Sequence, residues 1–193
     1  MPWWRVLLWV VLATPAALMA WRLASGDASA FDLYHPTGEL SLRLMILALL
    51  PGPLTEFFGP SRFLRGWLAI RRNLGVAGFA YGALHLGVYV LDMQALAAML
   101  GELGLPGIWT GWLALALLAI PAAISRDAAL RTLGRRWKQW QRLVYPALLL
   151  ALLHWALLDR DPVPALVHLA PLGLTWSLRL AARRGHRFRR RPV

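Results

Sequence analysis

The apolar residues of this chain fall into six long runs that are separated by shorter polar segments. The runs cover residues 6–24, 40–58, 74–91, 108–124, 140–158 and 163–180. Each has the roughly 17 to 25 residues that a helix needs to cross a hydrocarbon core of about 30 Å. The pattern therefore predicts an all-α fold, a polytopic membrane bundle of six transmembrane helices. Pro51 and Pro53 are expected to break or kink the second helix near its inner end.

The charges of the connecting segments alternate in sign along the chain. The connections after the second and fourth runs are basic and contain Arg62, Arg65, Arg71 and Arg72, and then Arg126, Arg131, Arg135, Arg136 and Lys138. The connections after the first, third and fifth runs carry Asp27, Asp32 and Glu39, then Asp92 and Glu102, then Asp159 and Asp161, with Arg160 as the only basic residue. Basic residues concentrate on the cytoplasmic side of membrane proteins, so both termini are predicted to be cytoplasmic.

Composition supports an integral membrane protein, since 59% of the residues are hydrophobic and only 16% are charged. The chain has no cysteine, which excludes disulfides, thiolate metal sites and cysteine catalysis. The excess of 21 Lys and Arg over 9 Asp and Glu does not indicate nucleic-acid binding, because the basic residues lie in short clusters between apolar runs. We expect residues 1–182 to form the transmembrane domain and residues 183–193 a basic cytoplasmic tail on anionic lipid. The first run also resembles a cleaved signal peptide, but its length favours a retained helix.

The third apolar run contains an ionisable side chain, His85. One face of the predicted helix, defined by steps of three or four residues, carries Gly75, Gly78, Gly82, His85, Tyr89 and Asp92. Glycine in a membrane helix allows either a neighbouring helix or a flat cofactor to approach the backbone. A histidine inside a membrane is by default a candidate for function, and its partner has to be identified.

The partner expected for His85 is His154, in the fifth run. The third and fifth helices run in the same direction, and the two histidines lie within roughly 5 Å of the same depth, in the outer half of the membrane. We therefore expect a haem iron between them, with Ala147 and Ala151 leaving room for the porphyrin beside His154. The alternative is that each histidine bonds a backbone carbonyl in a packed bundle. A zinc site is disfavoured, because two histidines leave its tetrahedral ligand set incomplete.

The remaining polar residues of the runs give weaker candidates. His168 lies about as deep in the sixth run and is the substitute haem ligand. Arg43, near the outer end of the second run, either pairs with a haem propionate through its planar guanidinium or extends to the lipid headgroups. His35 and His186 are expected to be solvated. No Ser-His-Asp arrangement, intramembrane carboxylate pair or glycine-rich phosphate loop appears, so no catalytic residue is assigned.

Three segments carry a resemblance to a known family: RRNLGVAGFAYGALHLGVYVLD at 71–92, SRDAALRTLGRRWKQWQRLVY at 125–145 and LLHW at 152–155. They are similar to the MsrQ family, formerly YedZ. This family is the haem-binding membrane subunit of the bacterial periplasmic methionine sulfoxide reductase system, within the ferric-reductase-like transmembrane group. The resemblance extends over the whole chain. It implies a multi-pass protein of the bacterial inner membrane that binds haem b, with FMN as a further cofactor.

The resemblance also implies a direction of electron flow. Electrons would come from the quinone pool or from a cytosolic flavin reductase and pass to the soluble molybdopterin enzyme MsrP, which repairs oxidised methionines in periplasmic proteins. The chain would be an electron-transfer subunit rather than the catalytic one. Two imidazole ligands agree with that role, because they leave no open coordination position on the iron. The alternatives are a stand-alone transmembrane ferric or quinone reductase with the same haem, and a non-redox helical scaffold.

Gln141 departs from the family pattern at the inner start of the fifth run. Relatives usually carry a histidine in the segment WxxxHRLVY, where this chain has WKQWQRLVY. Gln141 precedes His154 by 13 residues, about 20 Å along a helix, a spacing that suits two haems stacked across the membrane. An amide is a poor iron ligand, so we predict one haem, on the outer side. Pro146, between the two positions, is expected to kink the fifth helix.

Overall fold

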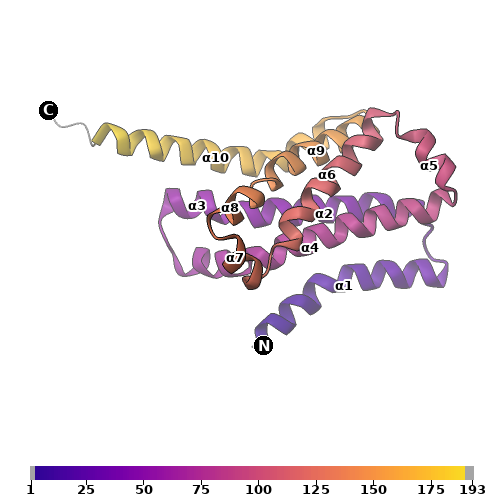
Figure 1. Ribbon diagram of the computed structural model, residues 1–193, viewed down its shortest axis with the longest axis horizontal. Coiled ribbons are helices and arrows are strands. Elements are labelled where there is room, and N and C mark those ends of the chain that lie inside the picture. Colours follow the sequence, from indigo (N-terminus) through magenta and orange to yellow (C-terminus); the bar gives the residue numbers. More distant parts are fainter. Residues whose placement is uncertain (1–2, 190–193) are drawn as a thin grey trace.

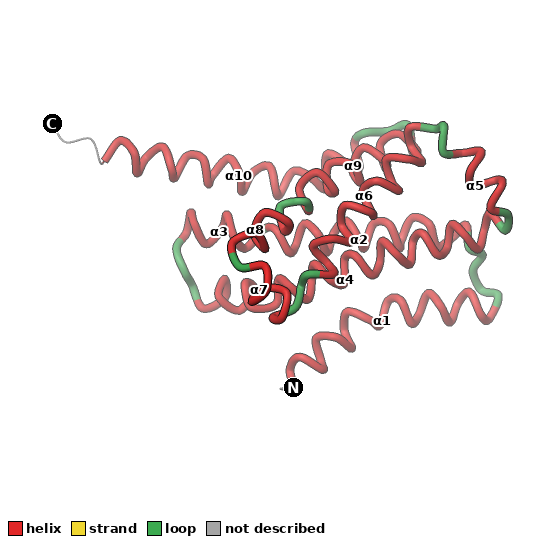
Figure 2. The backbone as a smooth tube through the Cα atoms, in the orientation of Figure 1, coloured by secondary structure: helices red, strands yellow, loops and turns green. Residues whose placement is uncertain are grey.

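The computed structural model describes residues 3–189, with side chains as far as residue 181, and over this range it contains helices and no strand (Figures 1 and 2). The elements are α1 (Trp3–Ser25), the 3₁₀ helix η1 (Phe31–Leu33), α2 (Tyr34–Leu49), α3 (Pro51–Phe58), α4 (Arg62–Met93), α5 (Leu96–Glu102), α6 (Pro106–Ala123), α7 (Asp127–Leu133), α8 (Arg135–Gln141), α9 (Val144–Asp159) and α10 (Val163–Arg189). The expected all-α fold is confirmed. The side chains of the predicted basic tail, 183–193, lie outside the described part.

Five stretches of the described chain are long and apolar enough to cross a membrane. They are Trp3–Ser25, Phe31–Phe58, Arg62–Met93, Pro106–Ala123 and Arg135–Asp159. They coincide with the first five predicted runs and confirm a multi-pass membrane protein. Within the described residues α10 is not among them, so the sixth crossing stays a prediction.

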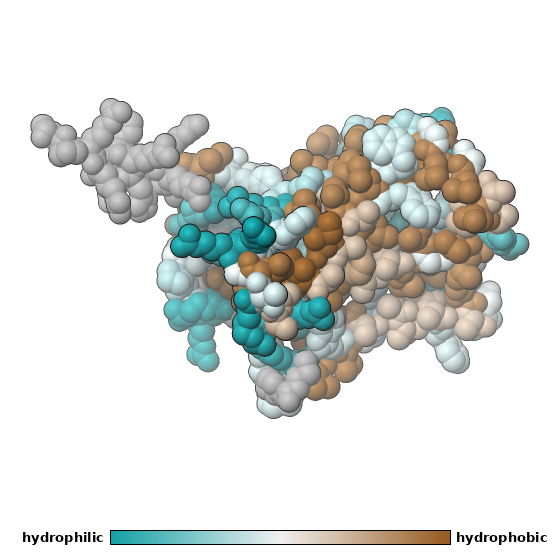
Figure 3. All heavy atoms as spheres, in the orientation of Figure 1, coloured by the Kyte–Doolittle hydropathy of each residue, from teal (hydrophilic) through white to brown (hydrophobic). Residues whose placement is uncertain are grey.

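The helices form two close pairs, α2 with α4 and α6 with α9, and α10 packs on α3 and α9 (Figure 1). Where α2, α6, α9 and α10 meet, the core contains the fully buried side chains Met45, Leu148 and Leu172. One end of the bundle carries α3, α7 and α8, and α5 lies at the other end (Figure 1). Hydrophilic residues gather over α7 and α8, while the middle of the visible face is apolar (Figure 3). This distribution fits a bundle with a basic inner end, although the side of the membrane on which each terminus lies stays a prediction.

Glycines of α4 allow α2 to pack closely against it. A Cβ added to Gly78 would lie 3.2 Å from the Met45 side chain and 3.3 Å from the Ser41 carbonyl, and the Ser41 hydroxyl donates to the Gly78 carbonyl at 2.7 Å. Small residues let membrane helices approach until such contacts form. The glycine face was expected to admit either a neighbouring helix or a flat cofactor, and at Gly78 it admits the neighbouring helix α2.

The predicted break at Pro51 is confirmed, because α2 ends at Leu49 and α3 begins at Pro51. Proline has no N–H, so the carbonyl of Leu47, four residues earlier, loses its usual helical donor. The indole Nε1 of Trp67 on α4 donates to this carbonyl at 2.9 Å. A side chain from the next helix thus replaces the missing backbone bond inside the membrane, where water is absent.

The third predicted helix is longer than its apolar run. The structure starts α4 at Arg62 rather than at residue 74, because the Ser61 hydroxyl caps the helix by accepting from the Leu64 amide at 3.1 Å. Its first basic residues are therefore helical and do not form a loop. Arg72 pairs with Asp127 of α7 at 2.6 Å, and this guanidinium holds the pKa of the carboxyl below its usual value.

The fifth predicted helix is divided, which corrects the expectation that Gln141 and His154 lie on one helix. Gln141 is the last residue of α8, and α9 begins only at Val144, so Gln141 and His154 do not share one helix. The 20 Å spacing along a helix therefore does not apply. Pro146 is the third residue of α9, a position that tolerates proline because amides of a first helical turn have no intrahelical partner to lose. The predicted fifth span is interrupted just before it, at residues 142–143.

The first helix is attached to α4 by one tyrosine beside a proline. The Tyr81 hydroxyl accepts from the Ala16 amide at 3.1 Å and donates to the Leu12 carbonyl at 2.8 Å. It thereby bridges two backbone groups of α1 next to Pro15, which lies inside that helix. A side chain inserted in this way is a recognised cause of a helix bend.

Candidate functional site

The structure brings His85 of α4 and His154 of α9 together. Their ring centroids lie 6.0 Å apart, and the ring planes make an angle of 87°. The two histidines come from helices that are separated by α5, α6, α7 and α8 in the sequence, and the helices run in the same direction, as expected. The pair that was predicted from depth alone is therefore an observed contact.

Both rings border a cavity of about 710 Å³, a volume typical of sites for small molecules and cofactors. Its walls include the small residues Gly38, Gly82, Gly111, Ala147 and Ala151, from α2, α4, α6 and α9. Its apolar side walls include Met45 and Leu118, while Tyr34, Asp92, Glu102 and Asp159 add polar groups. The cavity thus combines an apolar interior, small residues beside the histidines and a carboxylate-bearing wall.

Nδ1 of His85 is held by the start of α2. It lies 3.0 Å from the Tyr34 carbonyl and 3.1 Å from the hydroxyl of the buried Thr37. A carbonyl only accepts, so Nδ1 must carry the proton. The Thr37 hydroxyl itself donates to the Leu33 carbonyl at 2.6 Å, so it too can accept from the imidazole. The neutral ring therefore carries its lone pair on Nε2.

His154 is held in the same manner by α6. Its Nδ1 donates to the Gly107 carbonyl at 2.5 Å. A Cβ added to Gly111, one turn after Gly107, would lie 2.5 Å from this nitrogen. At His85 the same relation recurs, because a Cβ on Gly38, one turn after Tyr34, would lie 3.3 Å from the ring. In both places a glycine leaves the space through which the imidazole reaches the carbonyl of the preceding turn.

The arrangement fits iron in a macrocycle better than a bare ion. Histidines that bind metals usually donate their second ring N–H to a carbonyl or carboxylate, as both rings do here. Metal–imidazole bonds of about 2 Å place two ring centroids on opposite sides of one ion roughly 6 Å apart, close to the observed separation. Among the described residues no three His, Asp or Glu side chains converge on one point. A two-imidazole site therefore suits a metal whose other positions a porphyrin fills.

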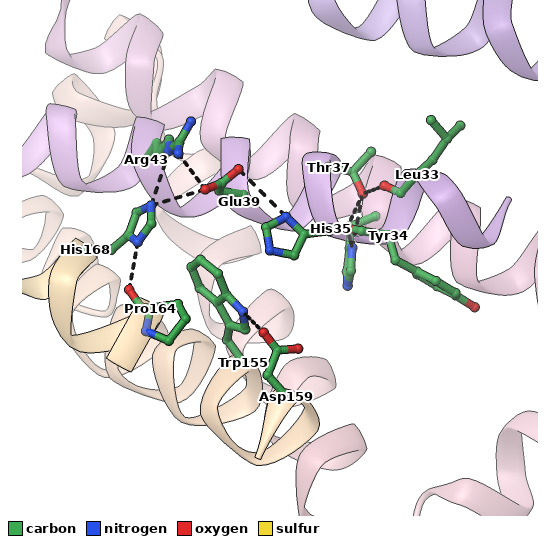
Figure 4. A network of polar contacts seen from close by, with 11 residues as sticks. Leu33, Tyr34, His35, Thr37, Glu39, Arg43, Trp155, Asp159, Pro164 and His168 are labelled. Atoms are coloured by element: carbon green, nitrogen blue, oxygen red, sulfur yellow. Dashed lines mark hydrogen bonds and ion pairs between the residues drawn. The ribbon is translucent and has the colours of Figure 1, made fainter. Parts of the chain in front are cut away.

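The other predicted site residues form a separate cluster around Glu39 (Figure 4). Arg43 donates from Nη2 to Glu39 at 2.5 Å and from Nε to Nε2 of His168 at 3.2 Å. Nδ1 of His168 donates to the Pro164 carbonyl at 2.8 Å, so both of its ring nitrogens are engaged. Neither Arg43 nor His168 lines the cavity. The structure does not bring them to the histidine pair, and His35 is exposed as expected.

Gln141 supports the end of α6. Its Nε2 donates to the Pro121 carbonyl at 3.0 Å, and Trp137 of α8 donates to the Ile124 carbonyl at 3.0 Å. Pro121 belongs to the last turn of α6 and Ile124 is its C-cap residue, and carbonyls at the end of a helix have no intrahelical donors. The amide at this position therefore has a structural partner.

Sequence reasoning missed Thr37, Gly107 and Gly111. The two glycines form a Gly-x-x-x-Gly pattern, which was a usable sign of close packing between membrane helices. Thr37 had no such sign, because its partner is 48 residues away.

Comparison with known proteins agrees with this site. Residues 37–152 match the family of ferric reductase like transmembrane components. The protein-methionine-sulfoxide reductase heme-binding subunit MsrQ of Klebsiella pneumoniae is 32% identical over 90% of this chain and 89% of its own length. The protein of the same name from Xanthomonas campestris strain 8004 is 34% identical over 88% of this chain and 84% of its own. No solved structure matches the chain.

Gly111→Ala should destabilise the protein by about 1–3 kcal/mol, because the added methyl group would overlap the His154 ring. Adding His154→Ala should remove most of this cost. Thermal unfolding of the cofactor-free protein in detergent, arranged as a double-mutant cycle, measures the coupling. Gly87→Ala is the control, because nothing lies within 4 Å of a Cβ at that position. An equal cost with and without the imidazole would contradict the packing described.

Proposed function

Since the chain belongs to the ferric-reductase-like transmembrane family and, within it, to the MsrQ haem-binding subunits of methionine sulfoxide reductase, we propose that it carries electrons through one haem b to a periplasmic reductase. The observation that carries this proposal is the histidine pair, with ring centroids 6.0 Å apart and each Nδ1 bonded to a backbone carbonyl. Both Nε2 lone pairs are thereby kept for iron.

The residues around the pair perform distinct tasks. His85 and His154 would hold the iron, and the carbonyls of Tyr34 and Gly107 fix the orientation and tautomer of their rings. When bound, haem supplies a one-electron carrier. Two imidazole ligands leave no position for oxygen or substrate, which favours electron transfer over oxygen activation. Electrons would leave on the outer side for an MsrP-like molybdopterin reductase that repairs oxidised methionines.

Two kinds of donor fit the entry of electrons into the protein. A quinone of the inner membrane would meet the protein within the lipid, whereas a cytosolic flavin reductase, with FMN as relay, would act from the basic end. The structural partner of Gln141 supports a single haem, so that the inner half of the bundle would lack one. The absence of a second haem would lengthen the path from a cytosolic donor.

His85→Ala and His154→Ala should each remove the haem from the purified protein, because only one imidazole of the pair then remains. The reduced-minus-oxidised visible spectrum, with haem counted per chain, measures this. His168→Ala is the matched control, since that histidine does not line the cavity. A colourless wild-type preparation, or unchanged spectra in both variants, would end the proposal.

Thr37→Val should weaken haem binding by about 10- to 100-fold, the usual effect of removing a hydrogen-bonding partner of a metal ligand. The valine keeps the volume of the side chain but leaves Nδ1 of His85 with the Tyr34 carbonyl alone. Thr37→Ser keeps the hydroxyl and should retain most of the affinity. Haem titration of the cofactor-free protein distinguishes the two, and equal affinities would show that the hydroxyl is not required.

The wild-type protein should contain one haem per chain, as measured by the pyridine haemochrome method against protein mass. Gln141→His should not raise this ratio unless the imidazole leaves the Pro121 carbonyl that now holds the amide. Two haems in the wild type would refute the assignment of Gln141.

A further inference from the structure

Glu39 lies at the centre of an acid–base cluster that the proposed electron transfer does not use. One carboxylate oxygen accepts from Arg43 and lies 3.4 Å from Nε2 of His168, and the other lies 3.8 Å from Nδ1 of His35 (Figure 4). The Trp155 ring covers the cluster, with centroid distances of 4.9 Å to His168 and 5.4 Å to His35. One carboxylate thus faces two imidazoles and one guanidinium inside a membrane protein.

This cluster adjoins the histidine pair. Glu39 and His35 line the same cavity as His85 and His154. Gly38, the neighbour of Glu39 in the chain, is the residue whose missing Cβ makes room for the His85 ring. A change of charge on a group bound in the cavity would therefore act on Glu39, which lines the same cavity.

The other carboxylates that line the cavity have a different environment. Asp92, Glu102 and Asp159 accept hydrogen bonds from Tyr34, Tyr89 and Trp155, at 3.0, 2.8 and 2.5 Å. These donors are neutral and stabilise an ionised carboxylate. Among the described cavity carboxylates, Glu39 alone has imidazoles within 4 Å. His35 can take a proton while Glu39 keeps its bond to Arg43, whereas a proton on Nε2 of His168 would displace the hydrogen bond that this atom accepts from Arg43.

We infer that the cluster of Glu39, His35 and His168 is a proton-exchange site: it takes up a proton when the haem is reduced and releases it when the haem is oxidised. The inference rests on the proposed function, because it requires haem in the cavity. Ferric haem, one electron and one proton give ferrous haem beside a protonated cluster, and oxidation reverses each change. With Arg43 charged, Glu39 ionised and both imidazoles neutral, the cluster has no net charge, so one added proton offsets the electron.

The proton has a short path to the surface of the protein. His35 is 61% exposed, whereas His168 and Glu39 are 17% and 20% exposed. The charged and titratable groups that face the cluster are His35 and Arg43 from α2, His168 from α10 and, across Trp155, Asp159 from α9. His35 is therefore the member that exchanges protons with the aqueous phase.

The test is the haem midpoint potential as a function of pH, measured on detergent-solubilised holoprotein. In the wild type the potential should fall as pH rises, by up to about 59 mV for each tenfold change in proton concentration. Glu39→Gln, which keeps the volume and an oxygen for Arg43, should reduce this slope at least twofold. Asp92→Asn, another cavity carboxylate, is the matched control and should retain the wild-type slope.

A second readout is the number of protons taken up per haem on reduction, followed with a pH indicator in weakly buffered solution. A potential that does not depend on pH in the wild type would overturn the inference while leaving the haem proposal intact. The same slope in wild type and Glu39→Gln would also overturn it. Failure of the wild type to bind haem is a separate outcome, which would end the proposed function itself.

Discussion

Two hydrogen bonds from imidazole to a backbone carbonyl determine what the histidine pair can do. Each binds Nδ1 of a histidine to a carbonyl on a neighbouring helix, Tyr34 for His85 and Gly107 for His154. Each also depends on a glycine one turn later, because a side chain there would occupy the space of the ring. The same device on two helices presents both Nε2 atoms as acceptors. Chemistry at the site follows from this backbone geometry more than from the identity of the cavity walls.

The rest of the bundle obeys the same requirement, that polar backbone groups find partners where water is absent. Pro51 leaves the Leu47 carbonyl without its helical donor, and the indole of Trp67 on α4 donates to this carbonyl instead. In the last turn of α6 the Pro121 carbonyl lacks a helical donor, and the side chain of Gln141 donates to it. Gln141 stands where the resemblance implies a histidine ligand, and it also supports the end of α6. Replacing it would affect both the chemistry and the end of a helix.

The sequence predicted those features that depend on local pattern or on depth. Apolar runs located the first five crossings, Pro51 marked the break in the second, and equal depth paired His85 with His154. It failed where the outcome depends on contacts between distant helices. Nothing near Arg43 in the chain shows that His168, 125 residues away, engages it, whereas Glu39 lies only four residues earlier on the same helix. The division between α8 and α9 was missed because the hydrophobic pattern continues through residues 140–158 while the backbone does not.

The walls of the cavity come from η1, α2, α4, α5, α6 and α9, and no described residue of α1 or α10 contributes to them. The lining of the cavity thus does not involve the described residues of the first and last helices. Both helices pack against helices that line the cavity. The α1 helix does so through its hydrogen bond with Tyr81 of α4, and the α10 helix through the core around Leu172. The two helices differ in how firmly they belong to the bundle: α1 has no buried residue and can vary in length or sequence, whereas α10 contributes the fully buried Leu172 to the core that supports the cavity.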